Sequence, residues 1–320
     1  MFFQTAGIEV APWVPPIVAF TISFFTSMGG VSGAFLLLPF QMSFLGYTNP
    51  SVSATNQLFN IVAIPSGVYR YYKEGRMVWP LTWVVVAGTL PGVFIGAFVR
   101  VAYLPDPKNF KLFAAGVLLY IGLKMIRDLL RKDTGEADKA TSEKRFAELI
   151  RNYRKKAAPS DTTGQESLPA VRVTHFNRKR LGYTFYGEKF EVPFWGIFAL
   201  SLIVGIVGGI YGIGGGAIIA PFLITFFGLP VYTVAGAALM GTFVTSVAGV
   251  AFYQAIAPFY PNLSVAPDWL LGILFGLGGM AGMYLGARCQ KLVPANTIKW
   301  MLAGIIVFTA LKYVVAFFGL

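Results

Sequence analysis

Two long apolar runs, each interrupted by glycines at the same internal place, constrain this chain more than any other feature. The first run carries Gly29-Gly30-Val31-Ser32-Gly33 and continues to Leu38-Pro39-Phe40. The second carries Gly212-Ile213-Gly214-Gly215-Gly216 and continues to Ala220-Pro221-Phe222. An offset of 182 residues relates Pro39 to Pro221 and pairs further residues without a gap: Gly46 with Gly228, Val52 with Val234, Gly67 with Gly249 and Tyr71 with Tyr253. Matching interruptions of this kind in the two halves of a chain are the best sequence indication of a transporter's binding site.

The residue composition indicates a polytopic membrane protein. The chain is 56% hydrophobic and 12% charged, with a mean hydropathy of +0.64, and the charged fraction is about half that of an average soluble protein. Apolar runs of about 20 residues recur along it. The net charge of +12 comes from basic residues between and beside those runs, which indicates membrane topology and anionic-lipid contact, not nucleic-acid binding. A single Cys and a single His exclude an intrachain disulfide and a His-based metal site, and we expect no cofactor.

We expect an all-α membrane protein built from two homologous repeats of four hydrophobic segments, the first of each broken by glycines or re-entrant. Residues 1–127 form the first membrane repeat, residues 193–320 form the second, and a polar region at 128–192 separates them. The expected segments are 14–45, 51–70, 78–99 and 109–127 in the first half, and 194–227, 231–257, 269–288 and 297–318 in the second.

The polar region at 128–192 is rich in Lys and Arg, so the positive-inside rule places it in the cytoplasm. Residues 146–153 have the apolar spacing of an amphipathic helix. Val171–Thr174 and Tyr183–Tyr186 are typical of two short strands around Asn177-Arg178-Lys179-Arg180. This region is either a solvated, lipid-facing linker or a small regulatory module. We expect it to be dispensable for transport, so that deletion of residues 135–188 leaves transport intact, but not for regulation or partner binding.

The first segment of each half, 32 residues at 14–45 and 34 residues at 194–227, is longer than the roughly 20 residues that one spanning helix requires. Each segment either crosses as one long, broken helix, which makes the halves parallel, or folds back as a re-entrant hairpin, which makes them inverted. The distribution of Lys and Arg favours the hairpin, because Arg288 and Lys291 then lie on the cytoplasmic side with Arg70 and Lys73.

The candidate binding residues are the glycines of the two interruptions and polar side chains near them. The set is Gly30, Ser32, Gly33, Asn56, Gln57, Asn60, Gly214, Gly215, Gly216, Thr242, Thr245 and Ser246. The interiors of the apolar runs contain no Asp or Glu, so this set is rich in hydrogen-bond donors and favours an anion over a metal cation. A helix that resumes after a glycine break also presents free N–H groups and a positive dipole end, and Ser32 is placed to cap it. The alternative is that these polar groups only tie helices together.

These residues resemble the TauE/SafE family of sulfite and organosulfonate exporters. The resemblance rests on the doubled glycine-rich run followed by Pro-Phe, the Ser/Thr/Asn-bearing second segment, and Gly75-Arg76-Met77-Val78-Trp79 before the third segment. It covers about 1–127 and 193–320, and it implies a multi-pass, inner-membrane permease for small sulfur-containing or carboxylated anions. It leaves open which anion moves.

Two classes of function follow. The first is a secondary transporter that exports a sulfite-like or sulfonate anion by alternating access, and the absence of a GxxxxGK[ST] motif argues against ATP hydrolysis by this chain. The second is a membrane-embedded enzyme or signalling subunit that uses the region 128–192. An enzyme requires a nucleophile–base pair or a metal cluster, which the lone Cys289 and His175 do not supply. The expected partners are a small anion and lipid, and a homodimer is left open.

Overall fold

The computed structural model describes residues 1–28, 32–73, 77–130, 171–185, 188–289 and 295–318. Within them, six helices are long and apolar enough to span a membrane, as expected for a polytopic membrane protein. These are α5 (Trp79–Ala102), α6 (Pro107–Leu130), α8 (Phe194–Tyr211), α10 (Val231–Ile256), α11 (Trp269–Cys289) and α12 (Ala295–Phe318).

Shorter helices fill the expected first and second segments. In the first half these are α1 (Val14–Met28), α2 (Ala34–Ser43), α3 (Ser51–Ala63) and α4 (Pro65–Lys73). In the second half, η2 (Gly215–Ile218) and α9 (Ile219–Phe227) follow α8, and η3 (Ala257–Phe259) follows α10. The segment expected at 51–70 is thus two helices, because Pro65 lacks the N–H that a continuous helix would use at that position.

Each glycine-broken run folds back on itself. A Cβ built on Gly215 would lie 3.2 Å from the Cα of Gly205, and a Cβ on Gly196 would lie 3.3 Å from the ring of Phe227. Ten residues of continuous helix would separate Gly205 from Gly215 by about 15 Å, so the chain reverses direction at the break. In the first run a Cβ on Gly33 would lie 2.9 Å from the Ser23 hydroxyl, which requires the same reversal. Of the two alternatives for these runs, the contacts agree with the hairpin.

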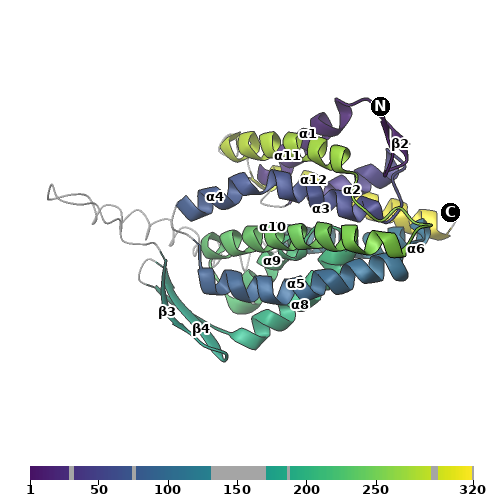
Figure 1. Cartoon of the computed structure of the whole chain (residues 1–320). Helices are drawn as coiled ribbons and strands as arrows, with labels where there is room; N and C mark the ends of the chain where they lie inside the picture. Colours follow the sequence, from purple (N-terminus) through teal and green to yellow (C-terminus); the bar gives the residue numbers. More distant parts are fainter. Residues whose placement is uncertain (29–31, 74–76, 131–170, 186–187, 290–294, 319–320) are drawn as a thin grey trace.

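Glycine stripes bring two pairs of long helices into backbone contact. Gly88, Gly92 and Gly96 of α5 face the backbone of α8, where a Cβ on Gly92 would lie 2.5 Å from the Leu202 carbonyl oxygen. Gly278, Gly282 and Gly286 of α11 face the backbone of α1 in the same way. Figure 1 shows the result: α3 and α10 run side by side through the middle, with α1 and α11 on one side of them and α5 and α8 on the other.

A three-stranded antiparallel sheet lies at the end of the molecule where α8 begins (Figure 1). Its strands are β3 (Val171–Phe176), β4 (Arg180–Phe185) and β5 (Glu188–Pro193). Strands are present where two were expected, but β4 begins at Arg180, which was expected in the turn, and Tyr186 lies outside the described residues. The strand β5 was not predicted. The helix expected at 146–153 lies outside the described residues. A second small sheet pairs β1 (Phe2–Phe3) with β2 (Ile8–Glu9) near the N-terminus.

The sheet is packed into the helical core. Leu181, Tyr183 and Phe185 of β4 are fully buried in one cluster with side chains of α5, α8, α9 and α10. The Tyr183 hydroxyl also lies 2.9 Å from the Thr233 hydroxyl of α10. The deletion of residues 135–188 that is expected to leave transport intact includes β4, whose loss would expose apolar core to solvent. We therefore restrict that prediction to the residues that precede the sheet.

Candidate functional site

The two hairpins meet on one side chain of α3. The Asn56 amide nitrogen donates to the carbonyl oxygen of Ala34, at 2.9 Å, and to that of Gly212, at 3.0 Å. These carbonyls belong to the turns of the first and second hairpin respectively. The Asn56 amide oxygen accepts from the Gln41 amide of α2 at 3.3 Å. One buried amide therefore links both glycine breaks and fixes their separation.

Asn60, one helical turn further along α3, makes a second contact with the glycine break at 212–216. Its amide nitrogen donates to the Ile213 carbonyl oxygen at 2.9 Å and lies 3.4 Å from the Ser246 hydroxyl of α10. The Ser53 hydroxyl, one turn before Asn56, donates to the Ile210 carbonyl oxygen at 3.2 Å. Positions 53, 56 and 60 share one helix face, which explains why all three reach the same turn.

Two threonines of α10 lie against the second glycine break. The Thr245 hydroxyl accepts from the Gly215 N–H at 3.1 Å and donates to the Gly241 carbonyl oxygen at 2.6 Å. The Thr242 hydroxyl donates to the Ala238 carbonyl oxygen of its own helix at 2.8 Å. A Cβ on Gly216 would overlap the backbone of α10 at Ala238, so only glycine allows this approach. The break thus lies directly against α10.

A direct bond between the two runs adds to these links. The Tyr211 hydroxyl, at the last residue of α8, donates to the Phe35 carbonyl oxygen in the first turn of α2 at 2.8 Å. Tyr211 is fully buried, as are Tyr47 and Tyr253 nearby in the fold. The sequence analysis did not select these tyrosines, although a tyrosine inside an apolar run is a polar group that requires a partner.

Several buried polar atoms at this place have no hydrogen-bond partner among the residues that the structure describes. They are the Ser23 hydroxyl, the Gln41 amide oxygen, both amide atoms of Gln57, and the Asn60 amide oxygen. All four side chains are fully buried. An unsatisfied buried polar group costs about 1–3 kcal/mol, so several in one region of a fold indicate a position for a ligand or water.

Gln57 is the most informative of these groups. It lies between α3 and α10, where a Cβ on Gly249 would overlap its amide. Gly249 is one turn along α10 from Ser246, which contacts Asn60. The Gln57 amide therefore lies close to the second break, and neither of its polar atoms is hydrogen-bonded to any described residue.

The structure brings together most of the residues selected from the sequence. Asn56, Asn60 and Thr245 are hydrogen-bonded to the second break. Ser246 contacts Asn60 and lies against Gly214, and Gln57 lies against Gly249, one turn further along α10. The hydroxyl of Ser32 accepts from the Ala34 N–H at 3.4 Å, a weak contact at the beginning of α2, and Gly33 is the N-cap residue. Gly30 lies outside the described residues. Sequence reasoning missed Ser23 and Gln41, which were visible as isolated polar residues in the first apolar run.

The donor capacity of the site differs from the expectation. The amide nitrogens of Asn56 and Asn60 are occupied by backbone carbonyls, so they are not free to bind a ligand in this conformation. Among the described site residues, the unpartnered donors are the Ser23 hydroxyl and the Gln57 amide nitrogen. Most of these polar groups therefore hold helices together, as one interpretation expected. A few remain unpaired and available to a ligand, as the other expected.

Arg100 is a buried cation at the other end of α5 from the sheet. Its guanidinium donates to the carbonyl oxygens of Thr48 and Leu104 and lies 3.7 Å above the ring of Phe110. These contacts connect the α2–α3 loop with the end of α5 and the beginning of α6. Arg100 therefore stabilises the loops at this end, and its contacts do not include either glycine break.

A cavity of 670 Å³ lies between α6 and the α8–α9 hairpin and reaches Ile218 of η2, two residues beyond the second glycine break. Its lining is almost entirely apolar and includes Tyr120, Val204 and Phe222. A cavity of this character suits hydrocarbon and has none of the unpaired polar groups described above, so it is not the candidate site. Within the part of the chain that the structure describes, no three His, Cys, Asp or Glu side chains are grouped as metal ligands would be.

Comparison with known proteins agrees with this architecture. The family model described as "Sulfite exporter TauE/SafE" matches residues 16–313. The chain is 20% identical over 279 residues to "Probable membrane transporter protein YunE" of Bacillus subtilis (strain 168), covering 85% of this chain and 86% of that protein. It is 24% identical over 122 residues to "Probable membrane transporter protein YdhB" of the same organism, covering 38% of this chain and less than half, 46%, of that protein. No solved structure matches.

Proposed function

The chain belongs to the TauE/SafE sulfite exporter family and is a multi-pass membrane transporter, and from this premise we propose that it exports a small sulfur-containing anion, sulfite or an organosulfonate, by alternating access. The proposed membrane is the inner membrane, with residues 128–192 in the cytoplasm. The two halves, 1–127 and 193–320, act as inverted repeats that move against each other around the glycine breaks.

The observation that carries this proposal is the unpaired, fully buried amide of Gln57 beside the second glycine break. A sulfite or sulfonate group presents three oxygen acceptors, and the Gln57 amide nitrogen is a free donor for one of them. No Asp or Glu lies within the apolar runs to repel an anion there. The free amide oxygens of Gln41, Gln57 and Asn60 do not suit the anionic group itself. They suit water or an N–H or O–H of the remainder of an organosulfonate.

The hydrogen bonds between α3 and the two hairpin turns are the contacts that change during the proposed transport cycle. Asn56 and Asn60 hold the two hairpin turns by hydrogen bonds to backbone carbonyls. Opening the site to either side of the membrane requires those turns to separate, and the same amides then become donors for the anion. Ser23 and Gln41 line the first turn, and Thr245 and Ser246 line the second.

Counterflow of labelled sulfite in proteoliposomes tests the transport activity, and a substrate panel that includes organosulfonates tests the anion. The variant Gln57→Met tests the site, because it removes both unpaired polar atoms and breaks no hydrogen bond within the protein. A hydrogen bond to a charged ligand contributes about 1.5–3 kcal/mol, so this variant is expected to bind the anion about ten- to a hundredfold more weakly. Its thermal stability is expected to be equal to or above that of the parent.

The matched control is Gln254→Met, which makes the same change at an exposed position of α10. It is expected to leave both affinity and stability unchanged. Parent-like anion binding by Gln57→Met would place the binding site elsewhere. The absence of counterflow for every anion in the panel, with folded protein, would refute the transport proposal itself.

A further inference from the structure

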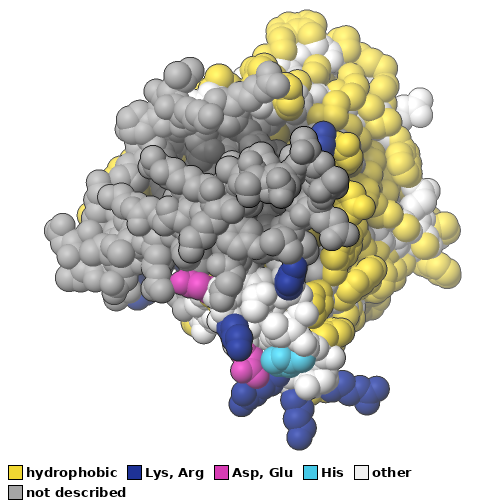
Figure 2. Space-filling view, turned by 90° about the vertical axis from the view of Figure 1, so that its left-hand side faces the viewer, with side chains coloured by type: hydrophobic (Ala, Val, Ile, Leu, Met, Phe, Trp, Pro, Cys, Tyr) yellow, Lys and Arg dark blue, Asp and Glu magenta, His cyan; other side chains and the backbone are white. Residues whose placement is uncertain are grey.

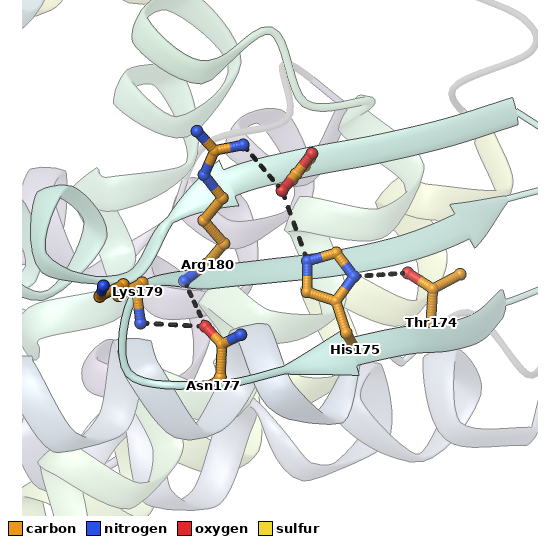
Figure 3. A network of polar contacts seen from close by, with 6 residues as sticks. Thr174, His175, Asn177, Lys179 and Arg180 are labelled. Atoms are coloured by element: carbon orange, nitrogen blue, oxygen red, sulfur yellow. Dashed lines mark hydrogen bonds and ion pairs between the residues drawn. The ribbon is translucent and has the colours of Figure 1, made fainter.

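The turn between β3 and β4 is a rigid, basic projection at the beginning of α8. The Asn177 side-chain oxygen accepts from the backbone N–H of Lys179, at 3.0 Å, and of Arg180, at 2.7 Å (Figure 3). The Phe194 N–H, at the first residue of α8, donates to the Lys179 carbonyl oxygen at 3.1 Å. These hydrogen bonds fix the turn and attach it directly to the start of α8, a helix that is long and apolar enough to span a membrane.

The charges on this turn are only partly neutralised. Glu191 of β5 pairs with Arg180 at 3.1 Å and lies 3.5 Å from His175. The neighbouring cations Arg178 and Lys179 are exposed, and no described carboxylate pairs with either of them. Two cations thus extend from a fixed backbone without a counter-charge from the described protein.

An aromatic cluster adjoins these cations. Phe176 of β3 contacts Phe194 with ring centroids 6.2 Å apart, and Phe194 and Phe198 contact Trp195 at 5.3 and 5.7 Å. Trp195 is 61% exposed although it begins a membrane-spanning helix. An exposed indole at such a position lies at the level of the lipid headgroups.

The cations project outward at that same level. Figure 1 places the β3–β4 sheet beside the beginning of α8, at the periphery of the helices. Figure 2 views the molecule from this end and shows Lys and Arg side chains extending beyond its edge, next to a continuous hydrophobic surface. Arg178 and Lys179 are both exposed and belong to a turn of this sheet, so they are available to a ligand at the periphery of the helices.

We propose that Arg178, Lys179 and the exposed ring of Trp195 bind the headgroup of an anionic phospholipid and so hold the sheet against the membrane surface. The two cations bind the phosphate and any further negative group, and the indole packs between headgroup and acyl chain. The aromatic part identifies the ligand as a lipid, because a free anion in water would gain nothing from an apolar ring at the bilayer surface. This proposal does not depend on which substrate is transported.

Native mass spectrometry of the purified full-length protein in detergent tests the proposal, by titration with phosphatidylglycerol, phosphatidylcholine and glycerol phosphate. The parent is expected to bind phosphatidylglycerol in preference to phosphatidylcholine. Each basic residue near a membrane surface changes binding to anionic lipid by about fivefold, so the double variant Arg178→Gln/Lys179→Gln is expected to weaken phosphatidylglycerol binding about 25-fold. Binding of phosphatidylcholine is expected to stay the same, and Trp195→Ala is expected to weaken both lipids.

The matched control is Lys108→Gln/Lys111→Gln, which removes the same charge from the opposite end of the molecule, at the beginning of α6. It is expected to retain the affinity of the parent for phosphatidylglycerol at this site. Equal binding of the two lipids by the parent, or parent-like phosphatidylglycerol binding by the Arg178/Lys179 double variant, would overturn the proposal. Competition by glycerol phosphate as strong as that by phosphatidylglycerol would overturn the assignment to a lipid. Thermal melting confirms that each variant is folded, and a Trp195→Ala variant with parent-like binding would remove the aromatic part of the site.

Discussion

Substituting Gly212 by alanine is expected to be among the most damaging single-methyl changes near the site. Gly212 ends α8 at φ 82°, and a Cβ there would lie 2.5 Å from the Cα and the carbonyl oxygen of Ser53 on α3. The left-handed conformation costs a residue with a Cβ about 1–2 kcal/mol. Forcing a methyl group into closely packed backbone costs about 1–3 kcal/mol more. Gly212→Ala is therefore expected to lower the free energy of unfolding by about 2–5 kcal/mol.

Two other glycines separate the contributions to this loss. Gly228 has φ 63° and nothing within 4 Å of the place that a Cβ would occupy, so Gly228→Ala is expected to show only the backbone strain, about 1–2 kcal/mol. Gly116 lies within α6, has an ordinary helical φ and has nothing within 4 Å, so Gly116→Ala is expected to leave stability near that of the parent. Unfolding in mixed micelles of increasing SDS, followed by far-UV circular dichroism, gives the three values under one set of conditions.

Gly212→Ala is expected to impair transport by more than its loss of stability explains. Displacing α3 from Gly212 also moves Asn56, which donates to the Gly212 carbonyl oxygen at 3.0 Å. Counterflow measured at a temperature where each variant stays folded separates the two effects. If Gly212→Ala unfolds with the same free energy as Gly228→Ala, then α3 does not pack on the break, and the geometry derived for the site is incorrect.

Three further outcomes follow from the sheet and the region before it. Tyr183→Phe removes the 2.9 Å hydrogen bond to Thr233 and is expected to lower the free energy of unfolding by about 0.5–1.5 kcal/mol, measured by the same titration. The pKa of Glu191 lies below its ordinary value of 4.5, chiefly because Arg180 hydrogen-bonds its carboxylate, so Arg180→Gln is expected to raise that pKa, as measured by NMR titration. The ion pair accordingly persists above pH 4.5 and is lost as the pH falls through the lowered pKa. Replacing residues 131–170 by a flexible linker is expected to leave counterflow unchanged, whereas a deletion that extends through β4 is expected to prevent folding.

The sequence predicts the breaks and the spans because both depend on local chemistry. Runs of apolar residues predict the six long helices, and the glycine cluster at 212–216 predicts where the second run reverses direction. In the first run the described residues reverse between Ser23 and Gly33. The break at Pro65 follows from the missing N–H of proline and was available from the sequence, although the segment at 51–70 was expected to be continuous. The strand β5 escaped prediction because Glu188-Lys189-Phe190-Glu191 carries too much charge to resemble a strand.

The sequence did not predict which hydrogen-bond partner each buried polar side chain would have. Asn56 and Asn60 were selected as anion donors because they are amides inside an apolar run. Their amide nitrogens instead bind the carbonyls of Ala34, Gly212 and Ile213, which lie up to 156 residues away in the chain. Such pairings depend on how two hairpins and α3 pack together, and neither spacing nor the 182-residue offset contains that information. For the same reason Ser23 and Gln41 become site residues only once the first hairpin has folded.

In the proposed transport cycle, the anion must compete with backbone carbonyls for the amide nitrogens of Asn56 and Asn60. A hydrogen bond from an amide to a backbone carbonyl contributes about 0.5–1.5 kcal/mol net, whereas one to a charged ligand contributes about 1.5–3 kcal/mol. An anion that replaces the Gly212 carbonyl as acceptor for Asn56 and the Ile213 carbonyl as acceptor for Asn60 exchanges two hydrogen bonds and therefore gains about 2–3 kcal/mol over the closed arrangement. It also releases the links between α3 and the turn of the second hairpin, so this gain is available only when that turn separates from α3. Differential binding of this size shifts a two-state equilibrium by about 30- to 150-fold, which is enough for the anion to drive opening from a closed state of moderate stability.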